Sequence, residues 1–300
     1  MSCYLIIGGV HKAGTTSLFK YLKDHPDICG ASKKETHFFT PLRYGRQTES
    51  MDVYNAYFDH CSSGTRYLLE ASPSYLYGRS RVADEISSKL NRTRIIFILR
   101  NPSDRFISYY KHCESKSYIE RGTTFEQFFN KNIENFPKMD LDDPFYRGLK
   151  EGNYYSYLTD WLNKSELDVR IVFFDDLVAS PRVVLREICE WLNLSGEIYK
   201  GYSFSVENKT RRYKHYRLHR LLLKMYRHLE SFFEKYHNIK SVIRNIYTIL
   251  NKNEEVQIEA SIKISLDRFY GPLNKKLRLL LLDQGYDNLP DWLNESDGNA

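Results

Sequence analysis

The sequence predicts an α/β fold, with a central parallel sheet and helices on both of its faces. Two observations predict it. Short apolar runs alternate along the chain with segments of helical spacing, and one run, Ile95–Leu99, is continuously apolar, as in a strand buried on both faces. The chain has 300 residues, 42% of them hydrophobic, which is enough for one large core. We therefore expect a single domain over residues 1–300.

Four short apolar runs are the expected strands. They lie in Tyr4–Gly8, in Arg66–Tyr75 before Ser72-Pro73, at Ile95–Leu99 and at the start of Asp168–Leu177. Because ligands of parallel α/β sheets bind at the carboxyl ends of the strands, the residues just after each run are the candidates for a site.

Helical segments with recognisable start signals follow these runs. The first begins at Thr15 or Thr16, and another begins near Ser103. A third has Ser180 as its N-cap and Pro181 at its first helical position. Strands that alternate with helices in this way favour a parallel sheet with crossover connections.

Residues 203–262 have a different character. They are rich in Lys, Arg, His and Tyr, and their apolar residues fall at helical spacing. We expect a basic, amphipathic helical insertion within the domain. Its basic side is interpreted first as a solvated helix face, with a role toward an acidic ligand or a membrane surface as the alternative.

Charge and hydropathy narrow the function classes. The net charge of +6 suits an anionic ligand and is too small to indicate nucleic acid. No window approaches eighteen apolar residues, so we expect no transmembrane segment. The first residues, "MSCYLIIGGV", are typical of a strand and not of a signal peptide, which predicts a cytoplasmic protein.

Cysteine usage predicts neither a disulfide framework nor a metal site. The five cysteines are scattered and odd in number, and no two of them form a CxxC pair. This pattern fits a reducing compartment.

The stretch Gly8–Leu18, "GGVHKAGTTSL", is similar to a phosphate-binding loop of the type G-x-x-x-x-G-K-[ST]. Thr15 occupies the usual lysine position, and Lys12 lies three residues earlier. Backbone N–H groups and the following helix N-terminus would bind a phosphate. The expected contacts come from Lys12, Ala13, Gly14, Thr15, Thr16 and Ser17.

A second anion site is expected after the third strand. Arg100 closes the buried run, and Ser108 lies two helical turns further on. Arginine binds tetrahedral oxyanions through two parallel hydrogen bonds. An arginine at a strand end is often only a surface residue, so the signal gains its weight from the neighbouring loop.

The two motifs together resemble those of sulfotransferases that use PAPS (3′-phosphoadenosine 5′-phosphosulfate), especially the heparan sulfate and bacterial carbohydrate types. "GGVHKAGTTSL" resembles their 5′-phosphosulfate loop, and "ILRNPSDRFISYY" resembles their 3′-phosphate motif. Further similar stretches are "KKETHFF", "EASPSYL", "GNYYSYLTDWL", "FFDDLVASP" and the basic "ENKTRR". The resemblance covers residues 4 to about 212 and continues loosely to Trp292. It implies a P-loop NTPase-like three-layer fold.

The resemblance also implies roles for the anion motifs. The donor would be PAPS, the product PAP, and no metal would be needed. Lys12 would neutralise charge that develops on the leaving phosphate. The 5′-phosphate would lie on Gly14 to Ser17, and Arg100 and Ser108 would hold the 3′-phosphate. Arg211 or Arg212 would add a contact from a closing loop.

Catalysis is expected from Glu35, which matches the glutamate that acts as base in the heparan sulfate enzymes. A surface ion pair with Lys33 or Lys34 is the alternative interpretation of Glu35. His37 is a competing base or an orienting group. Acceptor contacts are expected from Glu70, Ser74 and Tyr75.

Two departures leave the acceptor open. The lysine expected after Glu70 is Ala71, and the insertion at 203–262 has no counterpart in the glycosaminoglycan enzymes. Segments 41–64 and 117–150 are the expected acceptor-facing loops. The expected activity is transfer of a sulfuryl group to a hydroxyl or amine of a carbohydrate or small natural product. Neither the acceptor nor the oligomeric state follows from the sequence.

Two other functions compete with this one. A P-loop kinase or NTPase would use "IVFFDD", with Asp175 and Asp176 as its metal-binding aspartates after a strand. A non-catalytic module for acidic glycans or lipid headgroups would use the basic stretch 209–228. Activity without metal separates the transferase from the kinase, and loss of function in Glu35→Ala separates it from the binding module.

Overall fold

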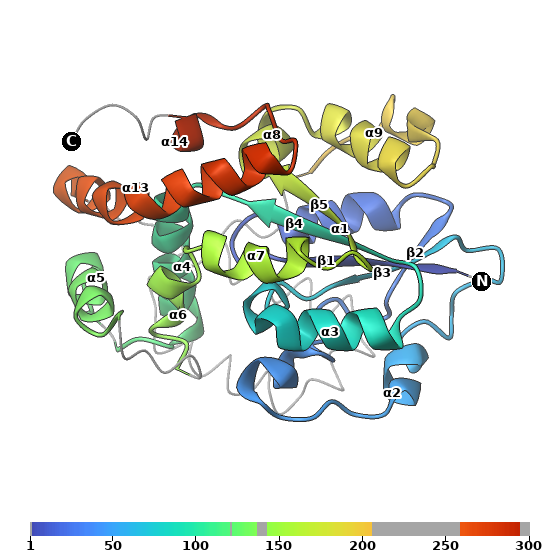
Figure 1. The fold of residues 1–300 in the computed structure, drawn as a ribbon, viewed down its shortest axis with the longest axis horizontal. Helices are drawn as coiled ribbons and strands as arrows, with labels where there is room; N and C mark the ends of the chain where they lie inside the picture. Colours follow the sequence, from blue (N-terminus) through green and yellow to red (C-terminus); the bar gives the residue numbers. More distant parts are fainter. Residues whose placement is uncertain (1, 121, 137–142, 206–258, 295–300) are drawn as a thin grey trace, which may run out of the picture. The chain divides into compact units, whose positions relative to one another are not determined.

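A sheet of five strands, with every neighbouring pair parallel, forms the centre of the fold (Figure 1). This computed structural model describes residues 2–120, 122–136, 143–205 and 259–294. The strand order is β2-β3-β1-β4-β5. The strands are β1 (Cys3–Gly9), β2 (Ile28–Gly30), β3 (Tyr67–Ala71), β4 (Thr93–Leu99) and β5 (Asp168–Phe173).

Helices connect the strands and extend the chain beyond them. The α-helices are α1 (Thr15–Lys23), α2 (Met51–Ala56), α3 (Arg79–Lys89), α4 (Pro102–Lys116), α5 (Phe125–Glu134), α6 (Arg147–Lys150), α7 (Tyr155–Leu162), α8 (Phe174–Ala179), α9 (Pro181–Trp191), α13 (Ala260–Asp283) and α14 (Asp291–Asn294). The 3-10 turns are η1 (Thr40–Tyr44), η2 (Leu76–Gly78) and η4 (Gly196–Tyr199). None of these helices is both long and apolar enough to cross a membrane.

The strand order places a ligand site beside β1. The chain leaves β1 through α1 and returns to the sheet at β2, on one side of β1. It later crosses from β3 through α3 to β4, on the other side. Because crossovers between parallel strands are right-handed, these opposite directions put α1 and α3 on opposite faces of the sheet. The carboxyl ends of β1, β3 and β4 therefore meet at the point where the strand order reverses, which is where such sheets bind ligands.

The expected fold class is confirmed, and the four strands expected from the sequence are all present. Along β4 every residue from Ile95 to Leu99 is buried, as the continuous apolar run predicts. The sequence analysis missed β2, which has only three residues and too few side chains to show an alternating pattern. Of the expected insertion at 203–262, residues 206–258 lie outside the described residues.

The chain divides into two compact units. The first comprises Met1–Phe106, Leu149–Asn208 and Ser265–Ala300, and it contains the whole sheet. The second comprises Ile107–Gly148 and Lys209–Ile264. In its described part, aromatic side chains of α4 and α5 pack together, with the rings of Tyr110 and Phe128 5.4 Å apart. The expectation of one domain over residues 1–300 stays a prediction.

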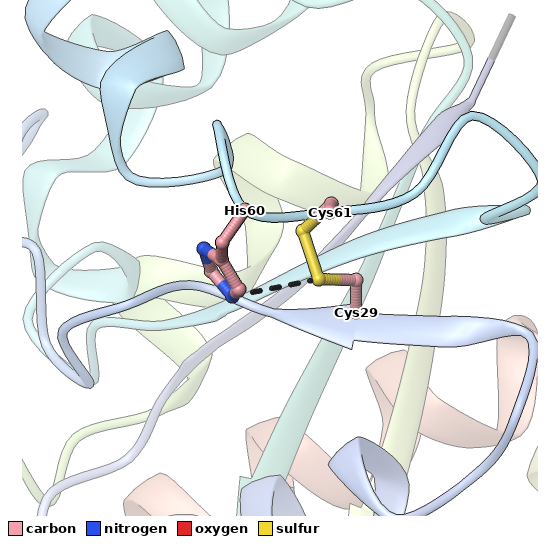
Figure 2. Close-up of side chains that lie close together, drawn as sticks. All are labelled: Cys29, His60 and Cys61. Atoms are coloured by element: carbon pink, nitrogen blue, oxygen red, sulfur yellow. Dashed lines mark hydrogen bonds between the residues drawn. A yellow bond between two sulfur atoms is a disulfide. The ribbon is translucent and has the colours of Figure 1, made fainter.

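A disulfide joins Cys29 of β2 to Cys61, which follows α2, and it corrects the expectation that the cysteines form none (Figure 2). The two residues are 32 positions apart, so no local spacing marks them as a pair. The fold brings them together because Ser32, just after β2, donates its backbone N–H to Tyr57, just after α2. His60 lies beside the disulfide, with its Nε2 3.6 Å from the Sγ of Cys29. These three side chains have the ligand types of a metal site, but the disulfide uses both sulfurs.

Candidate active site

The phosphate-binding loop leaves the carboxyl end of β1 in a tightly constrained path. A Cβ on Gly8 would lie 2.7 Å from the Phe97 ring, so no larger residue fits there without displacing β4. The Val10 N–H donates to the carbonyl of Ile98 on β4, 3.1 Å away. Lys12 and Gly14 both have positive φ, 70° and 82°, which turns the backbone around the loop. This glycine must be small as well, because a Cβ there would meet the Phe174 ring at 3.2 Å.

The N-terminus of α1 has the properties of an anion site. Gly14 is its N-cap, no side chain caps the helix, and its first turn contains no acidic residue. The first N–H groups of a helix have no partner within the helix and carry its partial positive charge. Three hydroxyl residues, Thr15, Thr16 and Ser17, form that first turn. An anion at this position would receive N–H and O–H hydrogen bonds together.

The structure joins the two predicted anion motifs directly. Arg100, the first residue after β4, donates from Nη1 to the backbone carbonyl of Lys12 at 3.0 Å. Its guanidinium also lies over the Phe174 ring, 4.6 Å from the centroid. Tyr154 fixes the backbone of the arginine, because its hydroxyl donates to the Arg100 carbonyl at 2.8 Å. Burial lowers the pKa of Arg100, so the charge is poorly solvated and would gain from an anionic partner.

The structure does not test three other expected donor contacts. Ser108 lies on α4, which begins just after Arg100, but in the part of that helix that belongs to the second unit. Arg211 and Arg212 lie outside the described residues. The roles of all three stay predictions.

Glu35, the expected base, lies between the ammonium of Lys34 and the imidazole of His37. Its Oε1 accepts a hydrogen bond from Lys34 Nζ at 2.8 Å, and its Oε2 lies 3.4 Å from His37 Nε2. Glu35 and His37 both have positive φ, which bends the segment so that alternate side chains meet. Partial burial alone would raise the pKa of Glu35, but the hydrogen bond with His37 and the charge of Lys34 outweigh it. The pKa of this carboxyl therefore lies well below its usual value.

The Lys34 ion pair is the alternative that the sequence left open for Glu35, and the structure contains it. It does not exclude a catalytic role, because the Glu35 side chain remains 37% exposed. His11, from the phosphate-binding loop, also lowers the pKa of Glu35 through its charge. The carboxylate is thus within electrostatic reach of the predicted phosphate-binding loop.

The end of β3 and the residues that follow it hold the segment that carries Glu35 in place. Five hydrogen bonds connect them: Thr36 Oγ1 to Glu70 Oε2 at 2.5 Å, Thr36 Oγ1 with Tyr75 Oη at 3.3 Å, the His37 N–H to Ser72 Oγ at 3.0 Å, the Phe39 N–H to Tyr75 Oη at 3.2 Å, and Thr40 Oγ1 with Ser74 Oγ at 2.7 Å. The stretches "KKETHFF" and "EASPSYL", far apart in the sequence, therefore form one unit.

This arrangement differs from the expected acceptor contacts of Glu70, Ser74 and Tyr75. Glu70 and Tyr75 are completely buried, and Ser74 is 6% exposed. Burial raises the pKa of Glu70, against the hydrogen bond from Thr36. In the structure these side chains hold residues 36–40 in place, and their contact with an acceptor stays a prediction. Ala71, in place of the family's lysine, is also buried.

A buried ion cluster beneath the site was missed by the sequence analysis. Glu151, fully buried, lies 2.9 Å from Arg43 Nη1, 3.3 Å from His11 Nδ1 and 3.8 Å from Arg105 Nη1. Burial alone would raise the pKa of Glu151, but the charges of Arg43, His11 and Arg105 lower it to about 2. Its partners come from the predicted phosphate-binding loop, from η1 and from α4. Glu151 directly precedes the stretch "GNYYSYLTDWL", and this was the one available signal.

The aspartates of the kinase alternative lie just beyond the carboxyl end of β5, within a helix and not on the strand itself. Asp175 and Asp176 lie in the first turn of α8 and are exposed. Asp175 Oδ2 accepts a hydrogen bond from Trp292 Nε1 at 3.2 Å. Their placement gives the kinase alternative no support.

Comparison with known proteins agrees with this geometry. The sulfotransferase domain family matches residues 4–235. Mouse heparan sulfate glucosamine 3-O-sulfotransferase 3B1 is 30% identical over 190 residues, which cover 63% of this chain and 45% of that protein. A bifunctional heparan sulfate N-deacetylase/N-sulfotransferase 1 of Caenorhabditis elegans is 27% identical over 199 residues, 63% of this chain and 22% of the relative. The chain thus matches less than half the length of these relatives.

The solved structures include a similar fold. A sulfotransferase from Alicyclobacillus acidocaldarius superposes with a TM-score of 0.66 at 22% sequence identity, and the match covers 97% of this chain and 98% of that one. This supports the three-layer arrangement of helices around a parallel sheet. The family match extends over most of the sequence and includes both anion motifs and the Glu35 segment. The chain therefore belongs to the sulfotransferase domain family.

Proposed function

We propose that the protein transfers a sulfuryl group from PAPS to a hydroxyl or amine of a carbohydrate or small natural product. The observation that carries the proposal is the hydrogen bond from Arg100 to the Lys12 carbonyl. This contact joins the two motifs expected to bind anions, which supports a donor with phosphate groups at both its 5′ and 3′ ends. Membership of the family and the relatives named for heparan sulfate sulfation support a carbohydrate acceptor.

The lysine, the hydroxyl residues and the backbone N–H groups of the loop after β1 have roles in this proposal. The 5′-phosphate lies at the N-terminus of α1, where backbone N–H groups and the hydroxyls of Thr15, Thr16 and Ser17 donate to it. The ammonium of Lys12 neutralises the charge that develops on the bridging oxygen as the S–O bond breaks. A sulfuryl group carries less negative charge than a phosphoryl group, so this single lysine serves where a kinase needs a metal.

Glu35 is the proposed base. It accepts the proton of the acceptor hydroxyl while the acceptor oxygen attacks sulfur in line with the leaving phosphate. The low pKa keeps Glu35 ionised across the neutral range. Lys34 and His37 hold its two oxygens in place. A positioned base of this kind typically contributes about 10²–10⁴-fold to the rate.

Transfer of labelled sulfate tests the proposal. The protein is incubated in EDTA with radiolabelled PAPS and, in separate reactions, desulfated heparan sulfate, simple glycosides, amino sugars and aliphatic alcohols. We expect label in at least one acceptor class, and its loss in Glu35→Gln and Lys12→Ala. Phosphate transfer from ATP that requires Mg²⁺, without any sulfate transfer, would overturn the proposal.

A further inference from the structure

The site contains one more titratable side chain that the proposed function does not use, the imidazole of His11. It lies in the donor loop, directly before Lys12. Its Nδ1 is 3.3 Å from Glu151 Oε2, and its ring stacks on Tyr77 with the centroids 5.6 Å apart and the planes 15° apart. The side chain is 25% exposed although its carboxylate partner is completely buried. The ring is thus held through Nδ1 and remains partly exposed.

Glu151 fixes which ring nitrogen is available. Its ionisation is secured by two buried arginines, Arg43 at 2.9 Å and Arg105 at 3.8 Å. An ionised carboxylate only accepts hydrogen bonds, so the Nδ1 of His11 must carry a proton. The Nε2 on the opposite edge is then the atom that can meet a ligand. A carboxylate that orients an imidazole in this way is the arrangement found in sites where histidine acts on a substrate.

The charges around His11 suit an anion rather than an acceptor hydroxyl. Lys12 follows it in the loop, and Arg43 and Arg105 lie behind Glu151. The buried cluster has two arginines against one carboxylate, so it leaves excess positive charge beneath the loop. The other titratable groups in reach are Tyr77, against the ring, and Glu35, which is itself paired with Lys34 and His37.

We propose that His11, oriented by Glu151, is a further donor-binding residue whose protonated imidazole donates from Nε2 to the 5′-phosphate of the donor nucleotide. The inference rests on the proposed function, because it needs a nucleotide in the loop. Glu151 acts through His11 and is a positioning residue. Arg43 and Arg105 act one step further away, by keeping Glu151 ionised.

Calorimetric titration with PAP between pH 5.5 and 8.5 tests the inference. Wild-type affinity is expected to fall as the pH rises, because a neutral imidazole with its proton on Nδ1 has no proton on Nε2 to donate. His11→Gln should bind about tenfold or more weakly at pH 5.5, as expected for a lost charge-assisted hydrogen bond, and like wild type at pH 8.5. The phosphates of PAP also titrate in this range. The measured quantity is therefore the ratio of the PAP affinities of wild type and His11→Gln at each pH. His11→Arg keeps a positive charge and should therefore bind PAP tightly at both pH 5.5 and pH 8.5.

The role of Glu151 has its own readout. In wild type, the ¹⁵N shifts of His11 should show a proton on Nδ1 throughout the titration. In Glu151→Gln the preference for that tautomer should weaken, even where circular dichroism shows a folded protein. If Glu151→Gln does not fold, Arg43→Gln provides the same test, because it weakens the support of Glu151 and leaves the carboxylate present.

The control is His60→Gln, which removes an exposed histidine beside the disulfide and outside the proposed site. It should bind PAP like wild type at every pH. Equal affinities of wild type and His11→Gln at all pH values, with binding still lost in Lys12→Ala, would overturn the role of His11 alone. Absence of PAP binding in wild type would instead overturn the proposed function.

Discussion

Replacing Thr36 by valine tests how the hydrogen bond to Glu70 holds residues 36–40 in place. The substitution keeps the shape of the side chain and removes the hydroxyl that donates to Glu70 at 2.5 Å. Glu70 is fully buried, and its other oxygen has no hydrogen-bond partner among the described residues. The buried carboxyl would thus lose the strongest of the side-chain hydrogen bonds that lower its pKa, ahead of those with Tyr75 and Ser72. We expect the free energy of unfolding to fall by about 2–3 kcal/mol, the range for a hydrogen bond to a group of this kind.

The pH dependence of the stability of Thr36→Val provides a second, independent test. The pKa of Glu70 is higher in the folded protein than in the unfolded chain. Its contribution to the free energy of unfolding is therefore complete at a pH below the pKa of the unfolded chain. That contribution is lost as the pH rises through the pKa of the folded protein. The Thr36 hydrogen bond lowers this pKa, so its removal should extend the loss to higher pH. The loss of stability in Thr36→Val should therefore grow from pH 4 to neutral.

Urea unfolding followed by fluorescence measures both effects. Thr40→Val is the matched control, because its hydroxyl meets Ser74 nearer the surface and leaves Glu70 untouched. The control should lose less than half as much stability. Because Thr36 lies between Glu35 and His37, kcat should also fall in Thr36→Val while PAP affinity stays unchanged. A change in stability below about 0.5 kcal/mol, the usual size for a surface substitution, would refute the reasoning.

Two further predictions concern the disulfide and the base. Closing a loop of 32 residues stabilises a protein by about 4 kcal/mol in the chain-entropy description, so Cys29→Ser with Cys61→Ser should lower the free energy of unfolding by about that amount. A dithiol should lower the stability of wild type to the same level. Equal urea midpoints of the double variant and untreated wild type would contradict this prediction. Lys34→Ala removes a cation that lowers the pKa of Glu35, so the acidic limb of its kcat–pH profile should move to higher pH than that of wild type. An unmoved limb would show that another group than Glu35 carries the proton.

Features of the site that depend on neighbouring residues could be predicted from the sequence. The donor loop is one continuous stretch, and its glycines and hydroxyls follow a strand at fixed spacing. Arg100 was found in the same way, because it ends a continuously apolar run. Each of these signals is local, so the spacing of residue types was enough to identify them.

Features that depend on distant residues could not be predicted. Cys29 and Cys61 meet because a three-residue strand and a later turn lie together, and the sequence marks neither contact. Glu151 is 140 residues from His11. A charged residue such as Glu151 in a polar stretch is usually exposed. Only the fold shows that Glu151 is buried together with two arginines.

The roles of the "EASPSYL" residues show the limit of a resemblance. The sequence grouped them with the Glu35 segment, which they contact, but it did not show the depth at which each side chain lies. Glu70 and Tyr75 are buried and hydrogen-bond to Thr36 and Phe39, so they hold the segment that carries Glu35 in position. Depth depends on how the segments stack, and no spacing within either segment encodes it.

Calorimetric titration with PAP in EDTA tests the central claim most directly, because the claim is that two adjacent anion sites hold the donor without a metal. Wild type should bind PAP, and Lys12→Ala and Arg100→Ala should each bind it at least tenfold more weakly, as expected for lost contacts between charged groups. Lys200→Ala, at an exposed lysine after η4, should bind like wild type. Failure of wild type to bind PAP, together with binding of ATP only in the presence of Mg²⁺, would contradict the account.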